Sequence, residues 1–177
     1  MNPMDIDRER WKNIRMLVLD VDGVLTDGTI LYDGEGRETR TFHVHDGSGI
    51  VHLKQGGLIP AVISGRDSAA VRRRLRDMGV EHFSLGRHKK LPEYRRIREQ
   101  VGLEDHQIAY MGDDLLDLCL LTRVGLALTV PEARPEVKEV CHYVTRAPGG
   151  RGAVREVVEL LLKAQGKWGK IVASYRI

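Results

Sequence analysis

The chain has 177 residues, of which 42% are hydrophobic and 30% are charged, a balance that suits one globular domain with a buried core and excludes global disorder. The formal net charge of +3 is too small to indicate a nucleic acid as partner. With only two cysteines, a disulfide scaffold is excluded. No run approaches the ~20 apolar residues of a membrane span, and residues 1–7 lack a hydrophobic signal region. We therefore expect a cytoplasmic protein with no membrane partner.

Short apolar runs alternate with segments of helical periodicity along the chain, a pattern typical of parallel α/β folds. Buried strands are predicted at residues 16–19, at the end of 57–63, and at 107–111 and 124–128. Apolar residues at helical spacing predict helices around residues 71–78, 94–101 and 154–162. Cys119 lies in an apolar run and is predicted to be a small core residue. We therefore expect one α/β domain over residues 1–177, with a three-layer, Rossmann-like parallel sheet and helices on both faces.

One segment interrupts this alternation directly after the first strand, where a βαβ unit would place a helix. Residues 29–32 and 38–44 are predicted strands around the turn sequence Asp33-Gly34-Glu35-Gly36, which indicates a hairpin. We expect this hairpin to project from the sheet as a flap over about residues 28–45. Because ligands of open α/β sheets bind at the carboxyl ends of the strands, the residues that follow each strand are the candidate site.

Two carboxylates, Asp20 and Asp22, follow the first strand, where they repel each other and are costly to desolvate. A bound cation would remove this cost, and Gly23 allows a sharp turn behind them. The alternative is an Asx-turn or a helix cap without a ligand. A calcium loop is excluded, because Val24 and Leu25 occupy the positions where an EF-hand needs an oxygen ligand and a glycine.

A second acidic cluster, made of Asp113, Asp114 and Asp117, follows the strand at residues 107–111. Mg²⁺ prefers oxygen ligands, so this cluster can complete an oxygen-lined Mg²⁺ site with the first pair of carboxylates. Helix capping is the alternative, above all for Asp114, because acidic residues are favoured at helix starts in any case.

The turn after the strand at 57–63, Ser64-Gly65-Arg66, offers a hydroxyl and backbone N–H groups of the kind that bind phosphate. Lys90 would add a positive charge for a phosphoryl oxygen, although alone it is typical of a solvated helix face. Arg66 has a guanidinium that can bind a carboxylate through two hydrogen bonds; its alternative is a surface arginine at a helix start.

In chain order, these groups closely resemble the four motifs of the haloacid dehalogenase-like phosphotransferase superfamily. Longer stretches are similar to one family within it, the 3-deoxy-D-manno-octulosonate 8-phosphate (KDO 8-phosphate) phosphatases. The resemblance covers roughly residues 14–168 and rests on residues 20–28, 42–50, 63–68, 112–117, 144–145, 149–157 and 164–167. His45 departs from the family pattern, which often has Arg or Lys at this position.

The resemblance implies Mg²⁺-dependent hydrolysis of KDO 8-phosphate through an aspartyl-phosphate, as a step in lipopolysaccharide precursor synthesis. Asp20 would be the nucleophile, and Asp22 would be the general acid and then the general base. The implied metal ligands are Asp20, the backbone carbonyl of Asp22, and Asp113. Asp114 and Asp117 would orient these ligands.

The resemblance also assigns the substrate contacts. Ser64, the Gly65 N–H and Lys90 would hold the phosphoryl oxygens, and Arg66 would bind the carboxylate of the sugar acid. Two alternatives stay open: another sugar-acid phosphate, such as a nine-carbon keto acid 9-phosphate, and a non-catalytic oligomerisation module. The second expects a broken nucleophile or acid, whereas both carboxylates are present.

The implied assembly is a homotetramer without a large cap domain, in which the flaps join around a shared centre and the active sites lie near subunit interfaces. Seven Lys and Arg against two Glu give residues 146–177 a charge of +5. We interpret the basic tail, about residues 163–177 with Trp168, as a segment that helps to close a neighbouring subunit's active site. A frayed, solvated tail is the alternative. Few of the nine aromatic residues lie near this tail, so a platform for stacking nucleic-acid bases is not expected.

Overall fold

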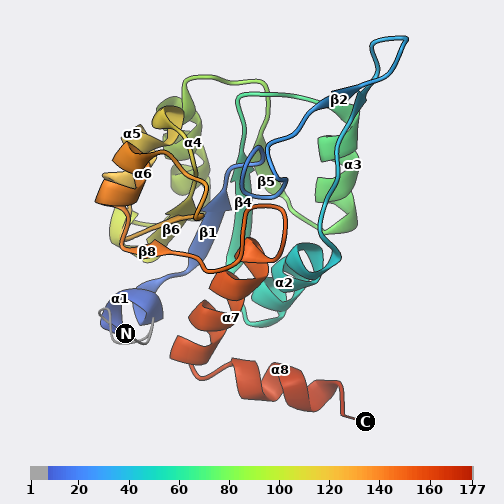
Figure 1. The fold of residues 1–177 in the computed structure, drawn as a ribbon. Coiled ribbons are helices and arrows are strands. Elements are labelled where there is room, and N and C mark those ends of the chain that lie inside the picture. The colour runs from blue at the N-terminus through green and yellow to red at the C-terminus, as the bar shows by residue number, and fades with distance from the viewer. Residues whose placement is uncertain (1–7, 177) are drawn as a thin grey trace.

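The computed structural model describes residues 8–176, and its centre is a six-stranded parallel sheet with the strand order β5-β4-β1-β6-β7-β8 (Figure 1). Every neighbouring pair is parallel. The strands are β1 (Met16–Leu19), β4 (Ile59–Ile63), β5 (His82–Ser84), β6 (Ile108–Met111), β7 (Leu126–Thr129) and β8 (Tyr143–Val144). All carboxyl ends therefore lie at one edge, and the central strand β1 lines up with β4 and β6 there, Leu19 pairing with Val62 and with Met111.

Helices cover both faces of the sheet, which confirms the predicted α/β fold class. The first face carries α4 (Lys90–Val101), α5 (Leu118–Leu121) and α6 (Pro135–Val140), and the other carries α2 (Val44–Gln55), α3 (Ala69–Asp77) and α7 (Ala153–Ala164) (Figure 1). Helix α1 (Arg8–Asn13) precedes β1, and two 3-10 turns, η1 (Asp105–Gln107) and η2 (Leu115–Asp117), flank β6. The apolar stripe predicted on α7 is wholly buried: Val154, Val157, Val158, Leu161 and Leu162.

The four predicted buried strands and three predicted helices are confirmed. The strand predicted at 38–44 ends at Thr39, and helix α2, which begins at Val44, was not predicted. Its sequence carries two glycines and no apolar stripe, so nothing local indicates a helix. Tertiary contacts accompany it: Gly47 lies against the end of the Arg74 side chain, where a Cβ would require the guanidinium to shift. The buried Asp46 carboxylate accepts hydrogen bonds from the backbone N–H of Gly152 at 3.0 Å and of Arg155 at 2.8 Å, which joins α2 to the start of α7.

The predicted flap is present but shorter than expected. Strands β2 (Leu31–Tyr32) and β3 (Glu38–Thr39) form a separate antiparallel pair that projects beyond the carboxyl edge of the sheet (Figure 1). Leu31 and Tyr32 are exposed. After Thr39 the chain turns inward, and Arg40 is buried, so the second strand cannot continue.

The basic tail is an ordered part of the fold up to residue 176, whereas Ile177, like residues 1–7, lies outside the described residues. Gly166 breaks α7, and α8 (Trp168–Ser174) follows. The Trp168 ring lies 5.2 Å from the Arg155 guanidinium and 5.7 Å from the His52 ring, and Tyr175 Oη lies 3.2 Å from His52 Nε2. The segment thus packs on α2 and α7 of its own chain, at the end of the molecule away from the flap (Figure 1).

One core prediction is wrong. Cys119 is exposed, because α5 is a single turn whose buried residues are Leu120 and Leu121. None of the helices within residues 8–176 has both the length and the apolar character needed to cross a bilayer.

Candidate active site

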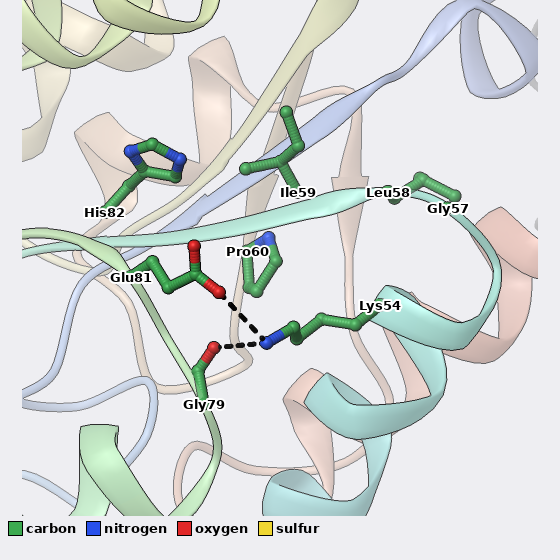
Figure 2. A pocket seen from close by; sticks show the side chains of 8 residues that line it. All are labelled: Lys54, Gly57, Leu58, Ile59, Pro60, Gly79, Glu81 and His82. Carbon is green, nitrogen blue, oxygen red and sulfur yellow. Dashed lines mark hydrogen bonds and ion pairs between the residues drawn. The ribbon is translucent and has the colours of Figure 1, made fainter.

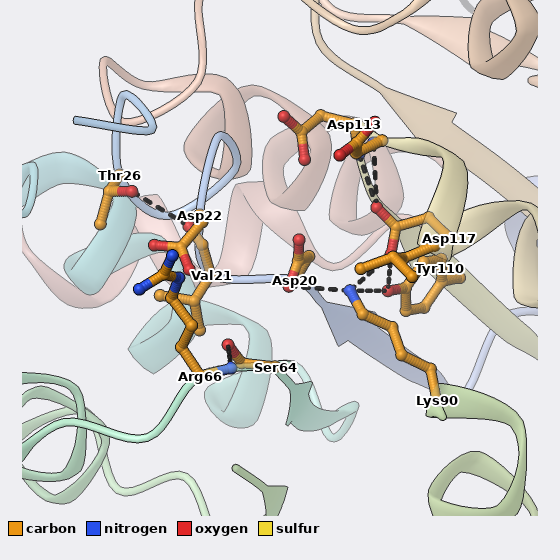
Figure 3. A network of polar contacts seen from close by, with 12 residues as sticks. Asp20, Val21, Asp22, Thr26, Ser64, Arg66, Lys90, Tyr110, Asp113 and Asp117 are labelled. Carbon is orange, nitrogen blue, oxygen red and sulfur yellow. Dashed lines mark hydrogen bonds and ion pairs between the residues drawn. The ribbon is translucent and has the colours of Figure 1, made fainter. Parts of the chain in front are cut away.

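The groups predicted to carry the chemistry meet at the carboxyl edge of the sheet. Asp20 and Asp22 follow β1, Gly65 and Arg66 follow β4, and Asp113 follows β6. They line one cleft of about 380 Å³, and Figure 3 shows the polar contacts among several of these residues. The full lining is Asp20, Asp22, Gly23, Gly28, Gly65, Arg66, His88, Lys90, Asp113, Asp114, Leu116 and Asp117.

Lys90, the first residue of α4, is not a solvated surface lysine. It is 3% exposed, and its Nζ lies 2.9 Å from Asp20 Oδ1 and 2.5 Å from Asp117 Oδ1. Nζ also donates to Tyr110 Oη at 3.2 Å. Burial works against the ammonium charge, but Asp20 and Asp117 together hold the pKa of Lys90 above its ordinary value. A permanent positive charge therefore lies beside the predicted nucleophile.

Asp117 holds the Lys90 ammonium in place, and its carboxylate is not free to bind a ligand. It is fully buried, and its Oδ1 accepts from Lys90 and, at 2.5 Å, from Tyr110 Oη. Its Oδ2 accepts from the backbone N–H of Asp113 at 2.9 Å and of Asp114 at 3.1 Å. Both oxygens are thus occupied, which supports the predicted orienting role and leaves Asp20 and Asp113 with the freer carboxylates (Figure 3).

Asp114 caps a helical turn, which is the alternative that the sequence offered for this residue. It is exposed, and its Oδ1 accepts from the Leu115 N–H at 2.8 Å, so it caps η2. Its carboxylate still lines the cleft.

The acidic cluster fits a hard divalent cation. Oxygen atoms of Asp20, Asp113 and Asp117 lie within 4.8 Å of one another. Burial, and then the negative charge of Asp117, raise the pKa of Asp20 and that of Asp113 to about 7, so ionising both is unfavourable without added positive charge. All donors are oxygens, which is the set that Mg²⁺ prefers.

Gly23 allows the loop after β1 to approach this cluster. Its φ is +83°, a conformation that side chains disfavour, and a Cβ there would overlap the Asp113 carboxylate. The turn inferred from the sequence is therefore also a close approach that brings the β1 and β6 loops together.

The turn predicted to bind phosphate, residues 64–66, has two residues at the cleft wall and one in the interior. Gly65 and the exposed Arg66 line the cleft, whereas Ser64 is 1% exposed and lies beneath it. Ser64 Oγ accepts from the Arg66 N–H at 3.2 Å, so it fixes the turn. The Arg66 side chain extends from β4 toward the loop of residues 20–22 (Figure 3).

Three further residues at the site were missed by the sequence analysis. Tyr110 lies within an apolar strand, so the sequence indicates only a core residue, but its hydroxyl accepts a hydrogen bond from Lys90. His88 lines the cleft and stands in the basic run of residues 87–90, which was the available signal. Arg40, in the flap, forms an ion pair with Asp22, and no local pattern distinguishes it from its exposed neighbour Arg37.

A second hollow, of about 260 Å³, lies at the opposite edge of the sheet, around the first residues of β4 and β5 (Figure 2). Its lysine, Lys54, already donates to the Gly79 carbonyl at 2.5 Å and pairs with Glu81 at 3.6 Å. No carboxylate cluster faces this hollow among its lining residues, so the carboxyl edge is the better candidate.

Comparisons with known proteins agree on one relationship. A family of haloacid dehalogenase-like hydrolases matches residues 86–155. The 3-deoxy-D-manno-octulosonate 8-phosphate phosphatase of Yersinia pestis is 42% identical over 159 residues, which are 90% of this chain and 85% of that protein.

Solved structures show the same relationship. The crystal structure of 3-deoxy-D-manno-octulosonate 8-phosphate phosphatase from Moraxella catarrhalis, in complex with magnesium ion, phosphate ion and KDO, matches with a TM-score of 0.93 and 41% identity, over 97% of this chain and 98% of that one. A cobalt-bound deoxy-D-mannose-octulosonate 8-phosphate phosphatase from Haemophilus influenzae matches with a TM-score of 0.87 and 41% identity, over 90% of this chain and 93% of that one.

Proposed function

The chain belongs to the 3-deoxy-D-manno-octulosonate 8-phosphate phosphatase family of haloacid dehalogenase-like hydrolases, and from this premise we propose its reaction. The protein hydrolyses the phosphate monoester of KDO 8-phosphate to KDO and phosphate, with Mg²⁺ as its cofactor, as a step in lipopolysaccharide precursor synthesis. One observation carries this proposal: Asp20, Lys90 and Asp113 converge on one cleft, in a chain related over nearly its full length to a phosphatase solved with magnesium, phosphate and KDO.

Asp20 is the proposed nucleophile. Its carboxylate attacks the phosphorus, the bond from phosphorus to the sugar oxygen breaks, and the leaving oxygen takes the proton of Asp22. A water molecule then attacks the phosphorus of the aspartyl-phosphate and gives a proton to Asp22. This second step restores the Asp20 carboxylate and the protonated Asp22, and it releases phosphate.

The proposed metal ligands are Asp20, the backbone carbonyl of Asp22, and Asp113. When bound, the cation neutralises the repulsion between the attacking carboxylate and the phosphate and stabilises charge in the transition state. Asp117 supports these ligands through the backbone N–H groups of the loop after β6, and Asp114 holds the same loop by capping η2.

The remaining residues are proposed to bind the substrate. Asp117 and Tyr110 hold the Lys90 ammonium, whose contact with Asp20 is exchanged for a phosphoryl oxygen. The Ser64 hydroxyl, whose oxygen also accepts from the Arg66 N–H, and the Gly65 N–H complete the phosphate site. Arg66 is exposed at the cleft wall, where its guanidinium binds the carboxylate that distinguishes a sugar acid from a simple sugar.

The assembly and location are also proposals. Residues 1–177 form one phosphatase domain, since the described elements belong to one central sheet, the helices on it and its flap. We propose a homotetramer in which the flaps meet, supported by the exposed Leu31 and Tyr32. Helix α8 lies far from its own cleft, so an active site that it closes belongs to a neighbouring subunit (Figure 1). Two free thiols agree with a reducing, cytoplasmic location.

A phosphate-release assay tests the reaction. The purified protein is offered KDO 8-phosphate, a nine-carbon keto acid 9-phosphate and a hexose phosphate without a carboxylate, each with Mg²⁺ and with excess chelator. We expect the highest kcat/KM for KDO 8-phosphate and no turnover after chelation or in Asp20→Asn. A higher kcat/KM for another ester would overturn the substrate, and turnover by Asp20→Asn would overturn the mechanism.

A further inference from the structure

Arg40 joins the flap to the candidate active site. It follows β3 of the exposed flap, yet its side chain is completely buried. Its Nε donates to Glu38 Oε1 at 2.6 Å, and its Nη1 forms an ion pair with Asp22 Oδ1. Within residues 8–176, this guanidinium is the cation that pairs with the Asp22 carboxylate.

The placement of this arginine leaves buried hydrogen-bond donors unused by the fold. Its Nη1 and Nη2, like Oδ1 of Asp22, are buried without a hydrogen-bond partner among the described residues, so the contact with Asp22 is an ion pair only. A purely structural arginine would be expected to use its donors in fixed hydrogen bonds, as buried polar groups normally do.

The reaction requires the Asp22 carboxyl to reach the leaving oxygen while Asp20 attacks phosphorus from the other side. Asp22 lies in the loop after β1, and 27% of its side chain is exposed, so packing alone does not fix its direction. A proton donor helps only when it is held within hydrogen-bond reach of the oxygen. Arg40, which is itself bound to Glu38 at the base of the flap, holds the Asp22 carboxyl through their ion pair.

We propose that Arg40 is a positioning residue, which orients the Asp22 carboxyl for proton transfer and couples that orientation to the position of the flap. The proposal deepens the proposed phosphatase function and rests on it. Arg40 acts through Asp22, so it matters most when the leaving oxygen needs a proton. An alkyl ester such as a sugar phosphate has this need, whereas para-nitrophenolate leaves without one.

The kinetic test compares Arg40→Gln and Arg40→Lys with wild type on KDO 8-phosphate and on para-nitrophenyl phosphate. Positioned acid–base groups contribute ~10²–10⁴ in rate, so we expect Arg40→Gln to lower kcat/KM for the sugar ester about 10- to 100-fold. We expect less than about a threefold loss on the aryl ester and partial rescue by Arg40→Lys. The inhibition constant of KDO should stay unchanged. The matched control is Arg37→Gln, because Arg37 is exposed on the same flap and pairs only with Asp33 and Glu35 among the described residues.

Two results would overturn the proposal. Equal losses on both esters would give Arg40 a role in folding or phosphate binding. A weakened inhibition constant for KDO with unchanged kcat would make Arg40 a direct substrate contact.

A second measurement does not depend on turnover. Hydrogen exchange of the flap amides, residues 28–42, should speed up in Arg40→Gln and to a similar extent in Asp22→Asn, and the double variant should add nothing further. Unchanged flap exchange in Asp22→Asn would refute the coupling. If wild type released phosphate from none of the esters, the proposed function would fail, while the exchange data would still decide whether Arg40 ties the flap to Asp22.

Discussion

Replacing Asp117 by asparagine tests how the fold holds Lys90, the lysine proposed to bind the phosphate. The two side chains have the same shape, but an amide has one acceptor oxygen where the carboxylate has two. In the native site Asp117 Oδ1 accepts hydrogen bonds from Lys90 and Tyr110, and Oδ2 accepts them from two backbone N–H groups. In Asp117→Asn, an NH₂ group must face one of these donor sets, so hydrogen bonds are lost there, and in either orientation the negative charge that pairs with Lys90 is lost.

The expected loss of stability follows from this geometry. Removing one partner of a buried ion pair costs about 3–5 kcal/mol. Lys90 keeps Asp20 at 2.9 Å, which places the loss at the lower end, about 3 kcal/mol. For a chain of this size each 1 kcal/mol lowers Tm by ~2–4 °C, so the melting temperature should fall by roughly 6–12 °C.

Urea and thermal unfolding of the metal-free protein measure this loss. The matched control is Asp77→Asn, which breaks an exposed ion pair with Arg73 at 2.9 Å and should change stability by less than about 1 kcal/mol. If Asp117→Asn unfolded within 1 kcal/mol of wild type, Asp117 would not be the structural anchor of Lys90, and the reasoning would be refuted.

Three further predictions concern the chemistry. Asp20→Asn should abolish turnover with the fold intact by circular dichroism, whereas Asp22→Asn should trap the phosphorylated enzyme, visible by intact-protein mass spectrometry; an unphosphorylated, fully active Asp22→Asn would contradict its role. Burial raises the pKa of Asp20 and of Asp113 to about 7, so the folded metal-free protein binds protons more tightly than the unfolded chain. Its stability should therefore decrease as pH rises from the ordinary carboxyl range toward 7, while Mg²⁺ affinity, measured by calorimetry, should rise over the same range; a pH-independent affinity would speak against these ligands. Arg66→Ala should raise the KM for KDO 8-phosphate more than the KM for an ester without a carboxylate, by a factor that corresponds to roughly 1.5–3 kcal/mol. An equal rise in both KM values would assign Arg66 to phosphate binding or to the fold.

Local sequence was sufficient for much of the sheet and for the position of the site. Apolar runs such as residues 16–19 and 107–111 mark buried parallel strands because both faces of such strands are covered. The acidic groups come directly after these strands, so the topology of parallel strands alone brings Asp20 and Asp113 to one edge.

Local sequence was insufficient where partners come from distant elements. Helix α2 lacks an apolar stripe, and it is joined to distant elements by the hydrogen bonds of Asp46 to the start of α7 and by the contact of Gly47 with the Arg74 side chain. Strands β5 and β8 are too short to stand out from their surroundings. Cys119 stands in an apolar run but faces solvent, because the direction of a single helical turn is set by the surface on which it packs.

The contrast between Lys90 and Arg40 shows the same division. The motif order indicates Lys90 without showing that it is buried between Asp20 and Asp117. Arg40 belongs to no motif and becomes visible only where the flap folds back onto Asp22. The sequence by itself determined which charged groups stand at the strand ends, because that depends on spacing along the chain. Only the tertiary structure decided which of them are buried and paired, because desolvation and Coulomb energies depend on distances between segments far apart in sequence.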